Sequence, residues 1–314
     1  VGLAIMRFNP FWKMFEFFSA EKYIKTTMGE LSWNKLWGPL FHGKFSSFTP
    51  VISATWFWAR VFKRSASLGY PEGGFQSLAG AIETKAKQNS ASFVYNCEVQ
   101  KISEEKDGKI SIQTPKKEYI FDKVIFTLPT PLFFKLTPSL PDDYKQKYKS
   151  LHGIGAVNLV LALKKPFLSD GTYWLNINES NMPFLAVVEH TNFMPQASYG
   201  DDHLVYVGNY LSTDHPFFGF TSKQLINKFL PSLKKINPEF KSDWIRDSWV
   251  FKAPFAQPIV TTHYSQLIPP MTTPVNNLFL ANIQQVYPYD RGTNYAVELG
   301  EKAAKLCTSE SKLF

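Results

Sequence analysis

The chain has 314 residues, of which 44% are hydrophobic and 19% are charged, a composition typical of a folded protein that buries a sizeable core. Its net charge of +8 arises from lysines and arginines that are scattered singly or in pairs, and the absence of a basic tract argues against a dedicated nucleic-acid-binding protein. Two cysteines, Cys97 and Cys307, are too few for a disulfide framework or a zinc cluster, so we expect a reducing, cytoplasmic compartment.

Residues 1–45 and 53–60 are predicted to be helical and are rich in aromatic side chains. Apolar residues recur at three- and four-residue spacing in segments 11–18 and 31–37, and Ser19 opens a capping-box-like start between them. We expect these amphipathic helices to cover a sheet. A peripheral membrane contact through segment 11–18 is the alternative, whereas no apolar run in the sequence has the length of a membrane span.

A turn, a helix and a group of strands are predicted next. Tyr70-Pro71 and Gly73-Gly74 form a turn in which glycine permits positive φ, and a helix opens at residues 76–78. A hairpin signal follows at Asp107-Gly108. The alternation of apolar residues predicts strands over residues 93–102, 109–113, 118–121 and 124–129.

The pattern changes between residues 138 and 249 to that of a second domain. Gly153-Ile154-Gly155 is interpreted as a loop, and a helix over 222–236 is predicted to end before Asn237-Pro238. We expect a mixed sheet flanked by helices. Its strands are predicted at 156–163, 184–188, 204–210 and 243–251.

A strand, a loop and a helix are predicted to close the chain. The apolar strand 278–281 leads into a loop of turn formers and aromatics, and the helix begins near Gly292, where Thr293 and Asn294 are suitable N-cap residues. The first turn of a helix presents unpaired N–H groups and partial positive charge, so this junction attracts an anion or an electron-rich ring edge. An ordinary capped terminal helix is the alternative.

Three parts of the sequence resemble, in the same order, motifs of the flavin-containing amine oxidase and protoporphyrinogen oxidase superfamily. The first is the Tyr-Pro-x-Gly-Gly-x-x-x-Leu turn at 70–78. The second combines a Val-x-x-Ile strand at 99–102 with an Asp-x-Val-Ile-x-Thr-x-Pro strand at 122–129. The third is the Gly-x-x-x-Ala-Val-x-x-Gly helix at 292–300.

The resemblance implies an α/β (α+β) fold with an FAD-binding domain of the glutathione-reductase-like type. Residues 68–135 and 251–314 would form that domain, and residues 1–67 and 136–250 would form an inserted substrate domain. Members of the family carry a Gly-x-Gly-x-x-Gly turn at the extreme N-terminus, whose backbone reaches the pyrophosphate. This fingerprint is not in the sequence, so we expect the N-terminal Rossmann unit to be missing from this chain.

The resemblance also assigns cofactor contacts. The backbone at Val99 would hold the adenine, and the strand that ends at Pro129 would lie beside the dinucleotide. Where the family usually has Ala-Gly-Asp or Ala-Gly-Glu near the ribityl phosphate, this chain has Ala281-Asn282-Ile283, so the acidic residue is missing and Asn282 offers only a neutral amide. Tyr295 stands where protoporphyrinogen oxidases tend to have glycine. The other cofactor-binding residues implied are Gly73, Gly74, Thr127, Arg291, Gly292, Thr293, Asn294, Ala296 and Val297.

Candidates for the substrate side come from polar and aromatic residues at strand ends and in the closing loop. Arg291 is suited to an anionic substrate or phosphate, and a salt bridge with Asp290 is an equal alternative. No catalytic residue is assigned, because a flavin itself accepts the hydride, and no cluster has metal-ligand spacing. The substrate-side candidates are Glu189, His190, Tyr287, Tyr289 and Trp249; for His190 the alternative is a structural histidine.

The resemblance implies an FAD-dependent oxidoreductase that transfers a hydride from a small-molecule substrate to the flavin. Two alternatives stay open. One is a flavin-dependent sugar-nucleotide mutase, since that related group also surrounds its flavin with tyrosines and arginines. The other is a non-catalytic binding protein that retains the fold, because the dinucleotide fingerprint is missing and Asn282-Ile283 stands in place of the family's Gly-Asp or Gly-Glu.

Overall fold

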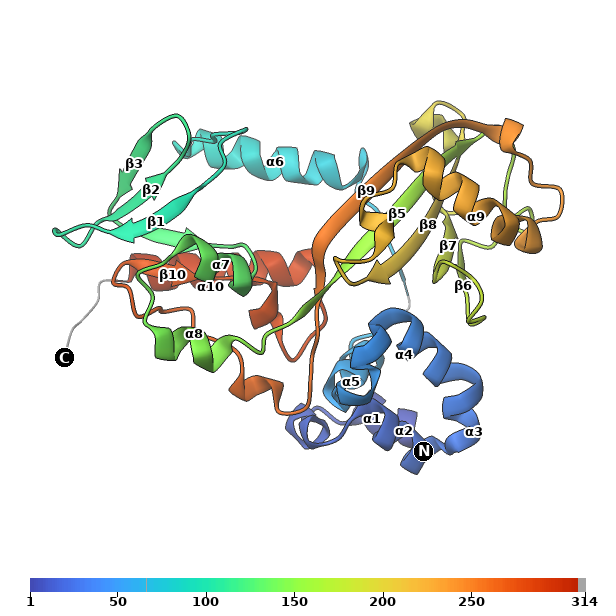
Figure 1. The fold of residues 1–314 in the computed structure, drawn as a ribbon, viewed down its shortest axis with the longest axis horizontal. Helices are drawn as coiled ribbons and strands as arrows, with labels where there is room; N and C mark the ends of the chain where they lie inside the picture. Colours follow the sequence, from blue (N-terminus) through green and yellow to red (C-terminus); the bar gives the residue numbers. More distant parts are fainter. Residues whose placement is uncertain (66, 310–314) are drawn as a thin grey trace. The chain divides into compact units, whose positions relative to one another are not determined.

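The computed structural model describes residues 1–65 and 67–309, which fall into two compact units (Figure 1). Unit 1 comprises Val1–Trp58 and His152–Tyr264, and unit 2 comprises Ala59–Leu151 and Ser265–Phe314. Each unit is therefore built from two stretches of chain that are far apart in the sequence. Among the described residues, none of the helices combines the length and apolarity needed to cross a membrane.

The N-terminal part of unit 1 is helical, as predicted, and is held together by aromatic side chains. Ser19 caps the second helix by accepting a hydrogen bond from the Lys22 N–H. The ring of Phe41 contacts those of Trp33, Phe45 and several neighbours. The helices are α1 (Gly2–Phe8), α2 (Ala20–Met28), α3 (Glu30–Ser32), α4 (Gly38–Phe45) and α5 (Ala54–Phe62), with the shorter turns η1 (Trp12–Phe17), η2 (Trp33–Trp37) and η3 (Ser46–Val51). Residues 59–62 of α5 already belong to unit 2.

Unit 1 also contains a five-stranded sheet in the order β6-β7-β8-β5-β9. Alternate residues of β5 and β8, among them Leu159, Leu161 and Val207, pack in an apolar core with α9 (Ser222–Ile236). A capping box at Thr221 begins α9, so the helix has the predicted bounds. The strands are β5 (Gly153–Leu163), β6 (Trp174–Asn176), β7 (Ala186–Glu189), β8 (His203–Leu211) and β9 (Ile245–Pro258).

Two expectations for this sheet are wrong. Every strand pair in it is antiparallel, so the sheet is not mixed. The apolar alternation that predicted the strands is the same in both directions and could not decide between them. Gly153-Ile154-Gly155 is the start of β5 rather than a loop, because Gly153 and Ile154 pair with Pro258 and Gln257 of β9.

Unit 2 combines a three-stranded antiparallel sheet with a two-stranded parallel one. The parallel pair, β4 (Val124–Phe126) with β10 (Leu278–Leu280), contributes Phe126 and Leu280 to an apolar core together with Phe133. The antiparallel strands are β1 (Lys101–Glu104), β2 (Ile110–Gln113) and β3 (Glu118–Phe121), and the helices are α6 (Gly74–Gln88), α7 (Thr130–Leu136), α8 (Asp142–Tyr148) and α10 (Thr293–Thr308).

The strand predicted at 93–102 is wrong over most of its length. β1 begins at Lys101, and the backbone of residues 91–100 lies outside any strand. Side chains in this segment are exposed, with Val94 at 60% and Tyr95 at 64%. A strand needs neighbours for its backbone N–H and C=O groups, and among the described residues this segment has no ladder partner.

A hydrogen-bonded side chain joins the ends of the two parallel strands. Asn282, only 2% exposed, donates its Nδ2 group to the Leu128 carbonyl and to Thr130 Oγ1, both at 3.1 Å. Its Oδ1 atom accepts the Gln284 N–H at 3.0 Å. The Asn282 N–H in turn bonds to Gln285 Oε1, which completes a capping box. Both ends of the Asn282 amide are thus used within unit 2.

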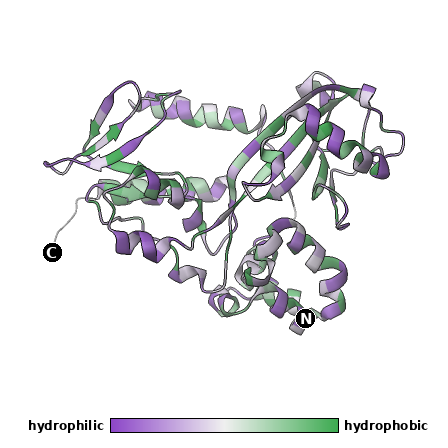
Figure 2. Cartoon of the chain, viewed as in Figure 1, coloured by the Kyte–Doolittle hydropathy of each residue, from purple (hydrophilic) through white to green (hydrophobic). Residues whose placement is uncertain are grey.

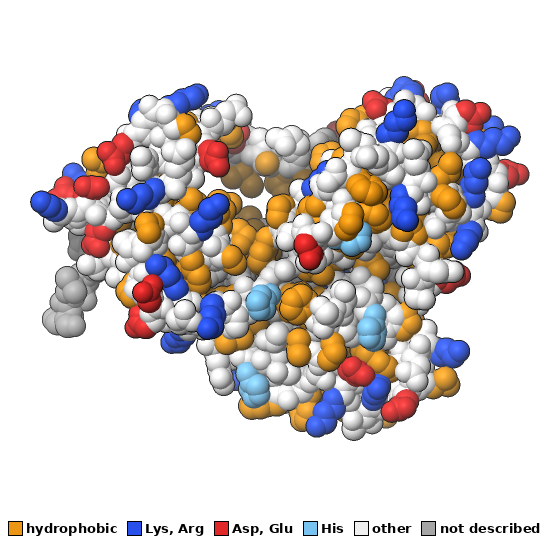
Figure 3. Space-filling model, viewed as in Figure 1, with side chains coloured by type: hydrophobic (Ala, Val, Ile, Leu, Met, Phe, Trp, Pro, Cys, Tyr) orange, Lys and Arg blue, Asp and Glu red, His pale blue; other side chains and the backbone are white. Residues whose placement is uncertain are grey.

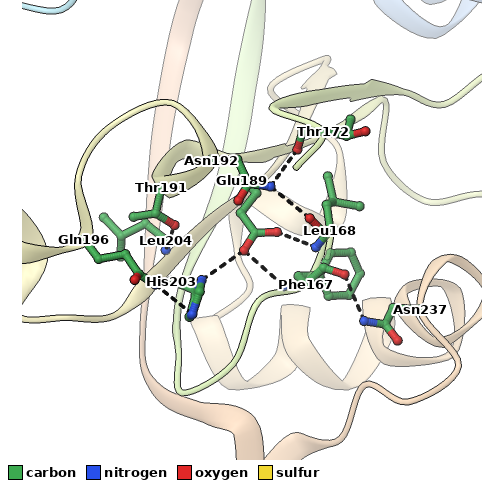
Figure 4. Close-up of polar contacts among 10 residues, drawn as sticks. All are labelled: Phe167, Leu168, Thr172, Glu189, Thr191, Asn192, Gln196, His203, Leu204 and Asn237. Carbon is green, nitrogen blue, oxygen red and sulfur yellow. Dashed lines mark hydrogen bonds and ion pairs between the residues drawn. The ribbon is translucent and has the colours of Figure 1, made fainter. Parts of the chain in front are cut away.

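A buried carboxylate at the end of β7 organises the neighbouring loop of unit 1 (Figure 4). Glu189 is 0% exposed, and it accepts the backbone N–H groups of Phe167 and Leu168. His203 Nδ1 lies 3.3 Å from the same carboxylate. Asn192 holds the next part of the loop by donating to the Leu168 and Thr172 carbonyls, each at 2.9 Å. Glu189 therefore acts as the anchor of this loop.

Replacing Glu189 with glutamine should destabilise unit 1. A carboxamide keeps one acceptor but turns an N–H donor toward the N–H of Phe167 or Leu168, so we expect a loss of about 2–3 kcal/mol in the free energy of unfolding. Urea denaturation of Glu189→Gln would measure it. Glu179→Gln is the matched control, since Glu179 is exposed. Equal stability of the two variants would contradict the anchoring role.

The substitution Asn282→Asp should destabilise unit 2. The new carboxylate would face the Leu128 carbonyl, two acceptors with no proton between them, at a cost of about 2–3 kcal/mol. The midpoint of urea unfolding checks this, with the exposed Asn227→Asp in α9 as control. A gain or no change for Asn282→Asp would show that the strand ends do not depend on this amide.

Candidate functional site

The candidate site of unit 2 begins where its parallel strands end. β4 and β10 pair in register from Leu278 with Val124 to Leu280 with Phe126, so their carboxyl ends lie together. Ligands of α/β proteins bind at such carboxyl ends. The segments that follow, 127–130 and 282–285, carry the predicted residues Thr127, Pro129 and Asn282, and the Thr130 N–H bonds to Gln284 Oε1 at 2.9 Å. The structure thus brings two of the predicted segments together.

The first turn of α10 follows directly from this junction. Gly292 is the N-cap residue, and no side chain caps the helix in the described part of the chain. The expectation that Thr293 or Asn294 caps the helix is therefore wrong, because both lie within the first turn. Uncapped N–H groups at the positive end of a sixteen-residue helix are donors suited to an anion or a ring edge. Ala296 and Val297 continue the same helix.

The loop before α10 is fixed by contacts to the end of α5. Asp290 forms an ion pair with Arg60, and the ammonium group of Lys63 lies 5.1 Å from the ring centre of Tyr289. Tyr289 stacks on Tyr295, with ring centres 5.1 Å apart and planes 8° from parallel. The Asp290 carboxylate is thus engaged by Arg60, and the role expected of Arg291 stays a prediction. No local pattern identifies Arg60, since it lies 230 residues away.

A hollow of about 160 Å³ lies beside these tyrosines. Burial is the main cause that raises the pKa of Tyr295, so its phenol is protonated at neutral pH and can donate a hydrogen bond. The lining residues are Gln285, Val286, Tyr287, Pro288, Tyr289, Tyr295, Glu298, Leu299 and Lys302.

The remaining predicted cofactor residues lie in the same unit. Gly73 and Gly74 have φ of +72° and +78°, which confirms the predicted turn, and α6 starts there. Val99 packs against the apolar core of unit 2. The segments at the strand ends are joined by the hydrogen bonds described above. The helix α6, which begins at Gly74, has no buried residue among its described positions.

Of the substrate-side candidates, Glu189, His190 and Trp249 belong to unit 1. His190 is 5% exposed, and its Nε2 atom lies 2.6 Å from the Tyr199 hydroxyl. Burial lowers the pKa of His190, which favours the neutral imidazole. With Glu189 occupied by backbone groups, Trp249 is the candidate of these three with a well exposed side chain, at 43%.

Trp249 lies on the face of the sheet opposite the apolar core of unit 1. It pairs across the strands with Val160, which pairs in turn with Tyr206. These side chains and Phe251, 61% exposed, line a hollow of about 350 Å³. The other lining residues are Tyr199, Asp202, Leu204 and Arg246, the last forming an ion pair with Asp202.

The sequence held a signal for this aromatic face that the prediction did not use. In segments 204–210 and 243–251 large apolar residues occupy alternate positions of a strand, which places Leu204 with Tyr206 and Trp249 with Phe251 on one face. Both strands pair with β5, and these four residues pair with alternate positions of it, which places their side chains on the same face of the sheet. Among the described residues, no group of three or more His, Cys, Asp or Glu side chains could hold a metal ion.

Solved structures share this fold. A protoporphyrinogen oxidase-like protein from Exiguobacterium sp. 255-15 matches with a TM-score of 0.69 and 16% identity, over 98% of this chain and 71% of that one. Reduced UDP-galactopyranose mutase matches with a TM-score of 0.70 and 13% identity, over 94% and 69%. The PF1083 protein from Pyrococcus furiosus matches with 0.64 and 18%, over 99% and 72%.

Sequence comparison identifies the family. A search against curated protein sequences finds no significant match. The family model described as flavin containing amine oxidoreductase matches residues 29–307, which is most of the chain, and the cofactor of this family is a flavin. The chain therefore belongs to the flavin-containing amine oxidoreductase family.

Proposed function

We propose that this chain is part of an FAD-dependent oxidoreductase in which unit 2 holds the flavin and unit 1 holds a small-molecule substrate. The observation that carries this proposal is the junction in unit 2, where the ends of two parallel strands meet an uncapped helix of sixteen residues. The family match supports the oxidoreductase class, and the substrate is unidentified.

The residues at this junction fit a flavin. The first-turn N–H groups of α10 have no side-chain cap, so they can donate to the electron-rich edge of the ring. Tyr289 and Tyr295 present a stacked pair beside them. When bound, the flavin would supply the acceptor for a hydride, which carries two electrons. Unit 2 would contact it through Gly73, Gly74, Val99, Thr127, Pro129, Arg291, Gly292, Thr293, Asn294, Tyr295, Ala296 and Val297.

Asn282 has a structural part in this proposal. Its amide hydrogens and carbonyl are taken up by Leu128, Thr130 and Gln284. Asn282 therefore positions the ends of β4 and β10, and contact with the cofactor is left to backbone groups of neighbouring residues.

The flavin site also needs a dinucleotide-binding strand, turn and helix from outside these 314 residues. A parallel sheet is normally buried on both faces, yet β4 and β10 form a pair alone among the described residues. Figure 2 shows hydrophobic as well as hydrophilic residues along α6, and both Phe75 and Ile82 of that helix are 52% exposed. Segment 91–100 lies outside any strand, so an added strand could pair with its backbone. These three features of unit 2 support the proposal.

The aromatic face of unit 1 is suited to an apolar or flat substrate. Trp249, Tyr206 and Phe251 offer ring surface, and their hollow has room for a small organic group. Such a surface holds a substrate and keeps water from it, which is the task left to the protein when a cofactor accepts the hydride.

A sugar-nucleotide mutase is the second candidate, favoured by the fold shared with UDP-galactopyranose mutase. The two functions differ in what happens to the flavin. An oxidoreductase substrate bleaches oxidised flavin under anaerobic conditions, whereas a nucleotide sugar stabilises the protein thermally without net reduction. A folded protein that includes the dinucleotide-binding unit and ignores FAD would remove both candidates and leave the non-catalytic alternative.

Thr293→Pro should weaken FAD binding without breaking α10. Proline is well tolerated at the first helical position, and Gly292 before it has the extended φ and ψ of −172° and 154° that proline requires. The change removes one first-turn N–H, so we expect up to about tenfold lower affinity. Titration of flavin fluorescence measures it in a version that includes the dinucleotide-binding unit. Thr293→Ala keeps the N–H, and equal affinity of the two variants would exclude this contact.

Trp249→Ala should raise the KM for any substrate that reduces the flavin, by roughly tenfold, with a smaller change in kcat. Removing the ring deletes a binding surface and leaves the cofactor in place. Steady-state kinetics of both parameters make the measurement. Trp174→Ala is the control, because Trp174 is 54% exposed on β6, outside the hollow. Unchanged kinetics in Trp249→Ala would place the substrate elsewhere.

A further inference from the structure

Several large apolar side chains among the first eighteen residues of unit 1 are exposed to solvent. Phe8 is 81% exposed, Phe11 75% and Phe17 63%. We call residues 3–18 the N-terminal apolar patch. Its other exposed apolar residues are Leu3, Ile5, Met14 and Phe18. Apolar patches of this kind on a protein surface mark sites of interaction.

The inner side of the patch is fixed to the rest of unit 1. The Tyr23 hydroxyl donates to the Gly2 carbonyl at 3.0 Å, and the Trp58 indole N–H donates to the Asn9 carbonyl at 2.8 Å. Phe15, 1% exposed, contacts the rings of Tyr23 and Trp58. Because the inner face of this segment is packed, the rings of Phe8 and Phe11 stay exposed to solvent.

The exposed charged residues within the patch are both basic. Arg7 and Lys13 are exposed, whereas Glu16, the sole acidic residue among positions 1–18, is 6% exposed and lies inside. The following helix adds Lys22 and Lys25, of which Lys25 is paired with a glutamate. In Figure 3, basic and hydrophobic side chains lie next to one another over the N-terminal helices. A surface that is apolar and cationic together is complementary to an anionic, amphipathic one.

We infer that the N-terminal apolar patch docks the protein on the headgroup region of an anionic lipid bilayer. Phenylalanine rings enter the boundary between headgroups and acyl chains, and arginine and lysine remain with the phosphates. Segments of this kind lie in the plane of the interface, which agrees with α1 and η1 being too short to span it. Docking of this kind requires neither flavin nor substrate, so it is independent of the proposed function.

Vesicle binding of the 314-residue chain tests the inference. Co-sedimentation would compare vesicles of phosphatidylcholine with vesicles that also contain phosphatidylglycerol. We expect binding to the anionic vesicles that weakens with salt. Arg7→Gln with Lys13→Gln should lower the affinity for them by about tenfold or more, since each cation contributes roughly fivefold. Phe8→Ser with Phe11→Ser should lower it by at least about tenfold.

Controls separate the patch from general charge and stickiness. Lys234→Gln with Lys235→Gln removes the same charge from exposed positions of α9, and Trp174→Ser removes an exposed ring from β6. Both should leave vesicle binding unchanged, and thermal unfolding verifies the fold of every variant. If Phe8→Ser with Phe11→Ser unfolds, Phe8→Ser alone should still weaken binding by several-fold.

Three outcomes would overturn the inference. The first is the absence of binding to anionic vesicles, and the second is an equal loss in the control variants. The third is a dimer in solution that dissociates in the Phe8→Ser with Phe11→Ser variant, because the patch would then be covered by a second copy of the chain. Light scattering of the two proteins distinguishes this third outcome.

Discussion

Unit 2 depends on a closure between two segments of chain that lie about 150 residues apart. β4 and β10 are three residues each, and a parallel pair of that length makes few backbone hydrogen bonds of its own. Asn282 adds bonds to Leu128 and Thr130 across this gap, at sequence separations of 154 and 152. Joining ends so distant costs loop entropy, although the cost rises slowly with length. The candidate site therefore forms only when the ends of β4 and β10 meet, although residues 152–264 of unit 1 lie between them in the sequence.

The same contact decides how far the sequence could predict the site. The strands, the loop and the closing helix carry local signals, since apolar runs, turn formers and small residues alternate in them. The use of Asn282 is not local, because its partners are the backbone of Leu128 and the hydroxyl of Thr130. Likewise Asp290 has a cation next to it in sequence, yet pairs with Arg60 from another helix. A charged side chain can pair with a residue next to it in sequence or with one that the fold brings close, and only the fold shows which pair forms.

Unit 1 gives the opposite case, in which local information placed several elements but was misleading for roles. α9 has its predicted bounds, because Thr221 and Gln224 form a reciprocal cap and Asn237-Pro238 stops the helix. Strand positions in β5 and β8 also followed from apolar alternation. Glu189 and His190 look alike as polar residues after a strand, yet one carboxylate anchors a loop and one imidazole bonds to Tyr199. Polar residues at strand ends satisfy buried backbone groups at least as often as they face a ligand.

The two units also differ in how completely they bury their own apolar surface. The core of unit 1 runs through both β5 and β8 to α9, with Leu159, Leu225 and Phe229 at 2% exposure or less. In unit 2, the fifteen-residue helix α6 has no buried residue, and segment 91–100 lies outside any strand. A group that binds the folded form of unit 2 and not its unfolded form stabilises it by mass action. Under the proposed function, flavin would therefore contribute to the stability of unit 2 far more than to that of unit 1. Binding of flavin and folding of unit 2 are thus expected to be coupled, while unit 1 buries its core without the cofactor.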